Sequence, residues 1–259
     1  MPEAIQGLFG GVSYTALAVA AAAMLLAGFL RGFVGFGAAL VIIMVLSVLF
    51  GPIAAVPISN LTGVPSMIQL MPNAIRFSER RFVVPFALAT FVAAPLGTWI
   101  LVSVDPELMK IAISVFVLAM VVMLYRGWRM STGTGYVSLL GAGAAAGLVQ
   151  GAAGIGGPPA VTVALSRPGT AQQQRANVIG AVNALSLCSL APLWYYGLFT
   201  RDVVLISIVL VPLYMLATWI GARFFSQGGH RHYRMAALLT LAVMGVVTLA
   251  LSIRDFAAG

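Results

Sequence analysis

Charged residues are scarce in this chain, and so are the side chains that carry out most catalysis. Only 8% of its 259 residues are Asp, Glu, Lys or Arg, whereas soluble domains carry about 25%. There are two histidines and one cysteine, Cys188, which excludes a disulfide framework and a cysteine metal site. No zinc signature, nucleophile elbow or phosphate-binding loop occurs. We therefore expect no enzyme, no metal and no cofactor.

Acidic residues are absent from every long apolar run, since all six lie outside them. This excludes a proton relay built from buried carboxylates. The net charge is +8, but the arginines are scattered singly between apolar runs instead of forming one basic stripe. Basic loop residues are typical of membrane proteins, so we expect no nucleic-acid partner.

Long apolar runs are what the sequence has in place of charge. The chain is 61% hydrophobic and its mean hydropathy is +1.04. A membrane-spanning helix needs roughly 20 apolar residues, and uncharged runs of about that length recur from residue 12 to residue 253. The composition predicts an all-α polytopic protein whose solvent is the lipid bilayer.

One glycine motif occurs twice. Residues 27–37 read AGFLRGFVGFG and residues 146–156 read AGLVQGAAGIG, with every glycine in register. Glycine is costly inside a helix, so four matched glycines predict a break in each half of the chain. Arg31 and Gln150 stand at the centre of the two copies. Paired breaks of this kind indicate the binding site of a transporter.

The distribution of arginine along the chain favours a re-entrant hairpin at each glycine-broken region over a single crossing of the membrane. If each broken region enters and leaves on one face, most basic residues fall on the opposite face from the termini, as the positive-inside rule requires. If each region crosses once, this bias disappears. An odd number of crossings per half makes the two repeats inverted, with both termini outside the cytoplasm. Runs 12–30 and 32–50 are each long enough to span, so the number of membrane segments, from six to ten, stays open.

The predicted fold therefore has two inverted repeats, each a glycine-broken re-entrant hairpin followed by three transmembrane helices. The first repeat covers 1–130, with hairpin 12–50 and helices 52–72, 82–104 and 107–126. The second covers 131–259, with hairpin 136–167 and helices 171–195, 202–222 and 233–253.

Arg31 is the sharpest candidate for a functional residue. An arginine at bilayer depth costs at least about 2.5 kcal/mol on insertion scales, so it needs a partner, a cavity or a ligand. Its planar fork suits an oxyanion such as sulfite, a sulfonate or a carboxylate. The alternative is a side chain that extends to the lipid headgroups.

The glycine-rich breaks suit the same ligand. Breaking the helix leaves backbone N–H groups without helical partners at Gly35-Phe36-Gly37 and at Gly154-Ile155-Gly156-Gly157. Two prolines follow the second segment, where a new helix can begin. The N-terminus of such a half-helix attracts anions. The alternative is close helix packing through small residues.

Neutral polar residues complete the candidate set. Gln150, Asn60 and Asn177 could orient a ligand or join two helices, and Arg175 is a candidate gate residue. The predicted substrate-binding residues are Arg31, Gly35, Phe36, Gly37, Asn60, Gln150, Gly154, Ile155, Gly156, Gly157 and Asn177.

The duplicated glycine frame resembles the TauE/SafE sulfite-exporter family, also called TSUP. The shared positions are Gly28, Gly32, Gly35 and Gly37, and Gly147, Gly151, Gly154, Gly156 and Gly157. The resemblance implies export of a sulfur-containing anion across the bacterial cytoplasmic membrane. Here Gly37 is followed by two alanines, where the family usually has glycines. Another small anion such as a carboxylate, cation-coupled import, and the oligomeric state all stay open.

Overall fold

The chain folds into a bundle of α-helices. The computed structural model describes residues 14–104, 108, 136–167, 169–228, 235 and 239. The helices within this part are α2 (Tyr14–Phe33), α3 (Ala38–Phe50), α4 (Pro52–Phe77), α5 (Arg80–Ser103), α7 (Tyr136–Ala153), α8 (Gly157–Ser166), α9 (Ala171–Tyr195) and α10 (Arg201–Ser226). The prediction of an all-helical, multi-pass protein is confirmed. The predicted helices 107–126 and 233–253 lie almost wholly outside the described residues, and the division into two inverted repeats stays a prediction.

Six of these helices are long and apolar enough to cross a membrane. The other two are short: α3 has 13 residues and α8 has 10, against the roughly 20 that a span requires. Each short helix directly follows the glycine break of its half. The chain therefore pairs a long helix with a half-helix at both places.

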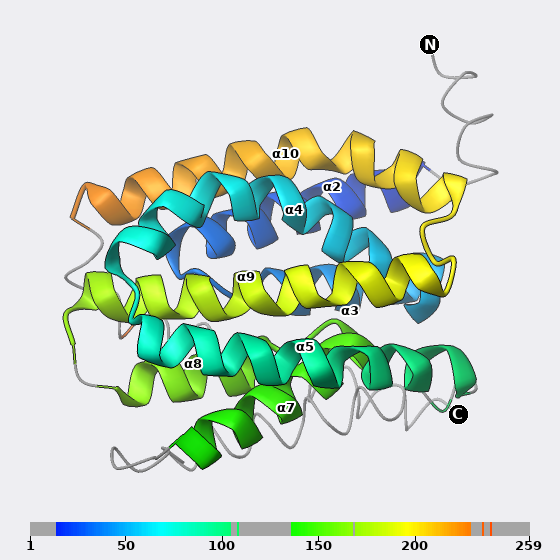
Figure 1. Cartoon of the computed structure of the whole chain (residues 1–259). Coiled ribbons are helices and arrows are strands. Elements are labelled where there is room, and N and C mark those ends of the chain that lie inside the picture. The colour runs from blue at the N-terminus through cyan, green and yellow to red at the C-terminus, as the bar shows by residue number, and fades with distance from the viewer. Residues whose placement is uncertain are drawn as a thin grey trace.

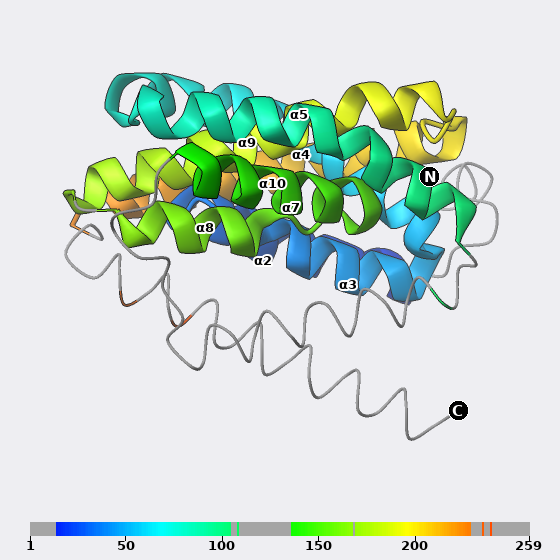
Figure 2. The same ribbon diagram turned by 60° about the horizontal axis from the view of Figure 1, so that its bottom comes forward.

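The two pairs enter the bundle from opposite ends (Figure 1). α2 runs from right to left and α3 returns to the right, whereas α7 runs from left to right and α8 returns to the left. Figure 2 shows α8 and α3 end to end along one face. Their N-terminal ends line one cavity.

Positive backbone φ angles produce the breaks. Gly37 has φ 89° just before α3, and Gly154 has φ 71° just after α7. Residues with a Cβ rarely adopt these angles. Glycine thus ends the first helix of each pair and redirects the chain.

The earlier glycines of each motif pack helices together, which corrects the expectation that all four break the helix. A Cβ on Gly32 would overlap the carbonyl oxygen of Thr218 in α10, and one on Gly151 would overlap that of Ala94 in α5. Gly28 and Gly147 meet the same two helices. Small residues allow this close approach, so α2 lies against α10 and α7 lies against α5.

Each break also carries one buried apolar anchor. Phe36 and Ile155 are each 1% exposed. Phe36, from the first break, packs into the core formed by α5, α7, α8 and α9. Ile155, from the second, packs into the core that contains α3, α4 and α10. The two halves of the chain thereby hold each other's breaks in place.

Candidate functional site

A small internal cavity lies where the two breaks meet. Its volume is about 40 Å³, enough for roughly three water molecules. Glycine and apolar side chains form most of the wall. The charged or polar side chains that line it are Arg31, Ser59, Asn60, Gln150, Ser186 and Tyr214.

Arg31 brings a charge into this interior. It stands in the last turn of α2 and is 4% exposed. Its Nη1 donates to the carbonyl oxygen of Gly35 at 2.6 Å, and its Nη2 donates to Oδ1 of Asn183. Both acceptors are neutral. Among the described residues the one ion pair joins Arg167 to Glu79, so no carboxylate there balances the Arg31 guanidinium.

Asn183 orients the guanidinium and was missed by sequence reasoning. Its Nδ2 lies 3.5 Å from the carbonyl oxygen of Met67 and 3.9 Å from the Met71 sulfur. These contacts with α4 turn its Oδ1 toward Arg31. One signal was present in the sequence: a second asparagine stands 123 residues after Asn60.

Gln150 makes a similar set of contacts in the other half. Its Nε2 lies 3.4 Å from Oδ1 of Asn60, and its Oε1 accepts a hydrogen bond from the Gly156 N–H at 3.0 Å. Asn60 in turn donates to the carbonyl oxygen of Val56 at 3.0 Å. Each motif centre thus contacts an asparagine from the other half and a glycine of its own break.

The N-terminal ends of both half-helices line the cavity. α3 contributes Gly37 and Ala38, and α8 contributes Gly157 and Pro158. Such ends carry about half a positive charge. The geometry therefore brings one guanidinium and two helix N-termini around a space the size of a small ion.

Hydroxyl groups on α4, α9 and α10 also reach the wall, and sequence reasoning missed them. They belong to Ser59, Ser186 and Tyr214. The side chain of Tyr214 is hydrogen-bonded to Ser66. Single hydroxyls inside apolar runs carry no pattern that distinguishes them from packing residues.

Eight predicted site residues line the cavity: Arg31, Phe36, Gly37, Asn60, Gln150, Gly154, Ile155 and Gly157. Gly35 and Gly156 lie beside it as backbone partners of Arg31 and Gln150.

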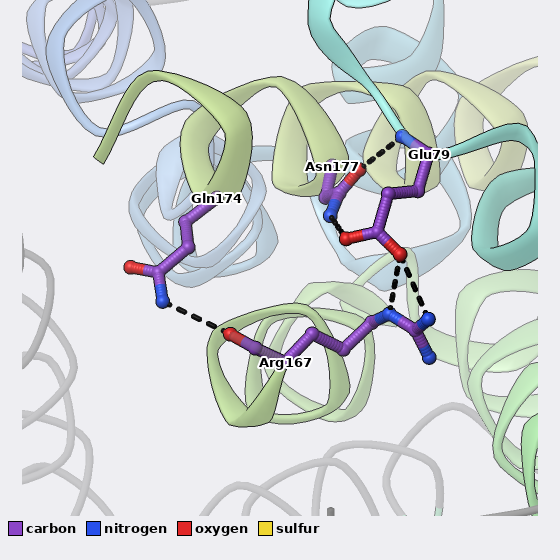
Figure 3. A network of polar contacts seen from close by, with 4 residues as sticks. All are labelled: Glu79, Arg167, Gln174 and Asn177. Atoms are coloured by element: carbon purple, nitrogen blue, oxygen red, sulfur yellow. Dashed lines mark hydrogen bonds and ion pairs between the residues drawn. The ribbon is translucent and has the colours of Figure 1, made fainter. Parts of the chain in front are cut away.

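The structure does not bring Asn177 to the cavity. It lies in a polar network near the start of α9 (Figure 3), where its Oδ1 accepts a hydrogen bond from the Glu79 N–H at 2.7 Å. Its Nδ2 lies 3.3 Å from the Glu79 carboxylate, which also binds the Arg167 guanidinium at 2.7 Å. Gln174 donates to the Arg167 carbonyl at 3.1 Å. This network joins the α4–α5 turn to the end of α8.

Arg175 is also outside the cavity. Its Nε donates to the Phe33 carbonyl oxygen at 3.0 Å and its Nη2 donates to that of Gly32. The guanidinium lies 4.2 Å from the centre of the Phe225 ring. It thus satisfies carbonyl groups at the end of α2, beside a second cavity of about 580 Å³. Its role as a gate stays a prediction.

Comparison with known protein families gives one match over most of the chain. The family described as "Sulfite exporter TauE/SafE" matches residues 20–248. No curated protein and no solved structure matches the chain.

Proposed function

The chain belongs to the TauE/SafE family of sulfite exporters, and from this premise we propose that it exports a small sulfur-containing anion, sulfite or an organosulfonate. Its multi-pass helical structure and its family make it a membrane transporter. The proposed location is the bacterial cytoplasmic membrane. The anion is held near the midplane, in the cavity between the two breaks.

The buried guanidinium of Arg31 is the observation on which this proposal rests. An isolated charge inside a protein costs several kcal/mol, and neutral hydrogen bonds offset only part of that cost. Arg31 has five N–H donors, of which the two contacts with Gly35 and Asn183 use only some. An anion in the adjoining cavity would balance the charge and accept hydrogen bonds from the remaining N–H groups of Arg31.

Export of an anion needs no coupling ion in this scheme. The membrane potential contributes about 2.3 kcal/mol per charge per 100 mV, and in a bacterium it expels anions. The absence of acidic residues from the apolar runs agrees with this mechanism, because coupled transporters commonly use buried carboxylates.

Thermal shift of the purified protein tests whether the site binds an anion. A ligand that binds the native state raises its apparent stability, so sulfite or methanesulfonate is expected to raise the Tm of the wild type. Arg31→Gln removes the charge but keeps an amide donor. Since a hydrogen bond to a charged group contributes about 1.5–3 kcal/mol, we expect this variant to bind roughly 10- to 100-fold more weakly.

Arg80→Ala is the matched control, because Arg80 is exposed at the start of α5. It should bind like the wild type. An Arg31→Gln protein that keeps its fold and its full anion-induced shift would show that the guanidinium does not bind the substrate.

A further inference from the structure

The two ends of the cavity are built on the same plan but carry different charge. Arg31 and Gln150 occupy corresponding positions of the repeated motif. Arg31 contacts Asn183 and its own break, and Gln150 contacts Asn60 and its own break. The α2–α3 end therefore presents a cation where the α7–α8 end presents a neutral amide.

The two ends of the cavity also differ in how many backbone N–H groups are free to donate to a ligand. α3 begins with Ala38 and Ala39, and within the described part of the chain no hydrogen bond is formed by either N–H. α8 begins with Gly157, Pro158 and Pro159, and proline has no N–H to donate. The N–H of Gly156 is already bonded to Gln150. Gly157 is the one residue among the first three of α8 that keeps an N–H, and no hydrogen bond of that N–H is found within the described residues. The first two residues of α3 therefore offer two N–H donors to the cavity, and the first three residues of α8 offer one.

The described part of the cavity wall carries one full charge, that of Arg31. Each break also joins the C-terminus of one helix to the N-terminus of the next, so the partial negative charge of the first offsets part of the half-charge of the second. Among the described residues, Arg31 is the one charged side chain that lines the cavity. The neighbouring Arg175 is directed to the carbonyls of Gly32 and Phe33 and lines the separate, larger cavity.

We infer that the site selects a small monoanion with its charge on one side, and that it rejects dianions. The oxyanion head lies against Arg31 and the N-terminus of α3, and the neutral remainder faces Ile155, Pro158 and Gln150. This inference rests on the proposed function and specifies its substrate class. It admits hydrogensulfite and methanesulfonate, and it excludes sulfate and doubly ionised sulfite.

Titration calorimetry of the detergent-purified wild type tests this selectivity. Methanesulfonate should bind at least about tenfold more tightly than sulfate, because the second buried charge has no partner. The affinity for total sulfite should fall as the pH rises through neutrality, where hydrogensulfite loses its proton. Methanesulfonate keeps one charge over that range, so its unchanged affinity serves as the control for titration of the protein.

Gln150→Arg adds a second guanidinium at the corresponding position. The variant is expected to bind sulfate at least about tenfold more tightly than the wild type does, and so to lose the preference for monoanions. Gln227→Arg adds the same charge at an exposed position at the end of α10, outside the cavity, and this control variant should keep the preference. If Gln150→Arg does not fold, the two wild-type measurements decide the matter.

The outcomes separate this inference from the proposed function. If sulfate binds the wild type as tightly as methanesulfonate does, or if sulfite affinity is independent of pH, the monoanion inference is wrong while anion transport stands. If no anion binds, both fail.

Discussion

At the scale of single residues, the role proposed for Arg31 has a cost in stability. Its guanidinium is buried, and the hydrogen bonds that it makes within the described part of the chain go to the neutral oxygens of Gly35 and Asn183. Neutral acceptors do not offset the full cost of removing a cation from water. The contacts with Asn183 and Gly35 therefore orient the charge toward the cavity, where in the proposed function an anion completes its coordination.

Asn183 and Asn177 offer a matched comparison, since both are buried asparagines on α9. Asn183→Ala removes the group that orients Arg31 and is expected to weaken methanesulfonate binding about tenfold. Asn177→Ala removes the hydrogen bonds with Glu79 and should cost about 1 kcal/mol of stability without changing affinity. Titration calorimetry with a parallel Tm measurement distinguishes the two. Equal loss of affinity in both variants would contradict the assignment of Asn183 to the site.

Sequence reasoning reached Arg31 and Gln150 because the repeated motif marks both positions. It named Asn60 and Asn177, which are 117 residues apart, as candidate site residues, whereas the contact with Arg31 that corresponds to the Asn60–Gln150 contact is made by Asn183. Asn60 is the ninth residue of α4 and Asn183 is the thirteenth residue of α9. The difference is about one helical turn, which keeps the same helix face toward the cavity. A fixed sequence offset cannot detect an inserted turn.

At the scale of helices, the motif glycines fall into two groups. Those within α2 and α7 allow close packing, and those after them form the breaks. Glycine content alone does not distinguish the two, because both uses depend on the absence of a Cβ. The short α8 was predictable from the motif and from Pro158 and Pro159, but hydropathy gives one unbroken run over 136–166.

Two glycines of α7 test the packing role directly. Gly151→Ala places a Cβ against the Ala94 carbonyl of α5 and should lower stability by about 1–3 kcal/mol, as other overpacked cores do. Gly141→Ala is the control, because a Cβ there would meet no atom of a neighbouring helix within 4 Å. Alanine at this position should raise stability by about 0.5–1 kcal/mol. Thermal unfolding in detergent gives both values, and an undisturbed Gly151→Ala protein would rule out the close α5–α7 contact.

At the scale of the whole molecule, the described arginines outside the cavity gather at one end of the bundle. The α4–α5 turn, the α8–α9 turn and the end of α10 lie at the left in Figure 1. They carry Arg76, Arg80, Arg81, Arg167 and Arg223. The opposite end has Arg201 at the α9–α10 turn. By the positive-inside rule the arginine-rich end faces the cytoplasm, which stays a prediction.

Cysteine labelling in intact cells tests this orientation. In a Cys188→Ala background, Arg201→Cys is expected to react with a membrane-impermeant maleimide added outside. Arg80→Cys should react only after the membrane is permeabilised. Both positions are exposed, so accessibility within the protein does not bias the comparison. The reverse pattern would invert the proposed topology.

Anion flux into and out of proteoliposomes tests the central claim most directly. With an imposed potential and no pH or sodium gradient, the wild type and Arg80→Ala are predicted to move labelled methanesulfonate away from the negative side. Arg31→Gln should move almost none. Flux that persists in Arg31→Gln, or that requires a proton or sodium gradient when the potential is clamped at zero, would contradict transport of an uncoupled anion on the Arg31 guanidinium.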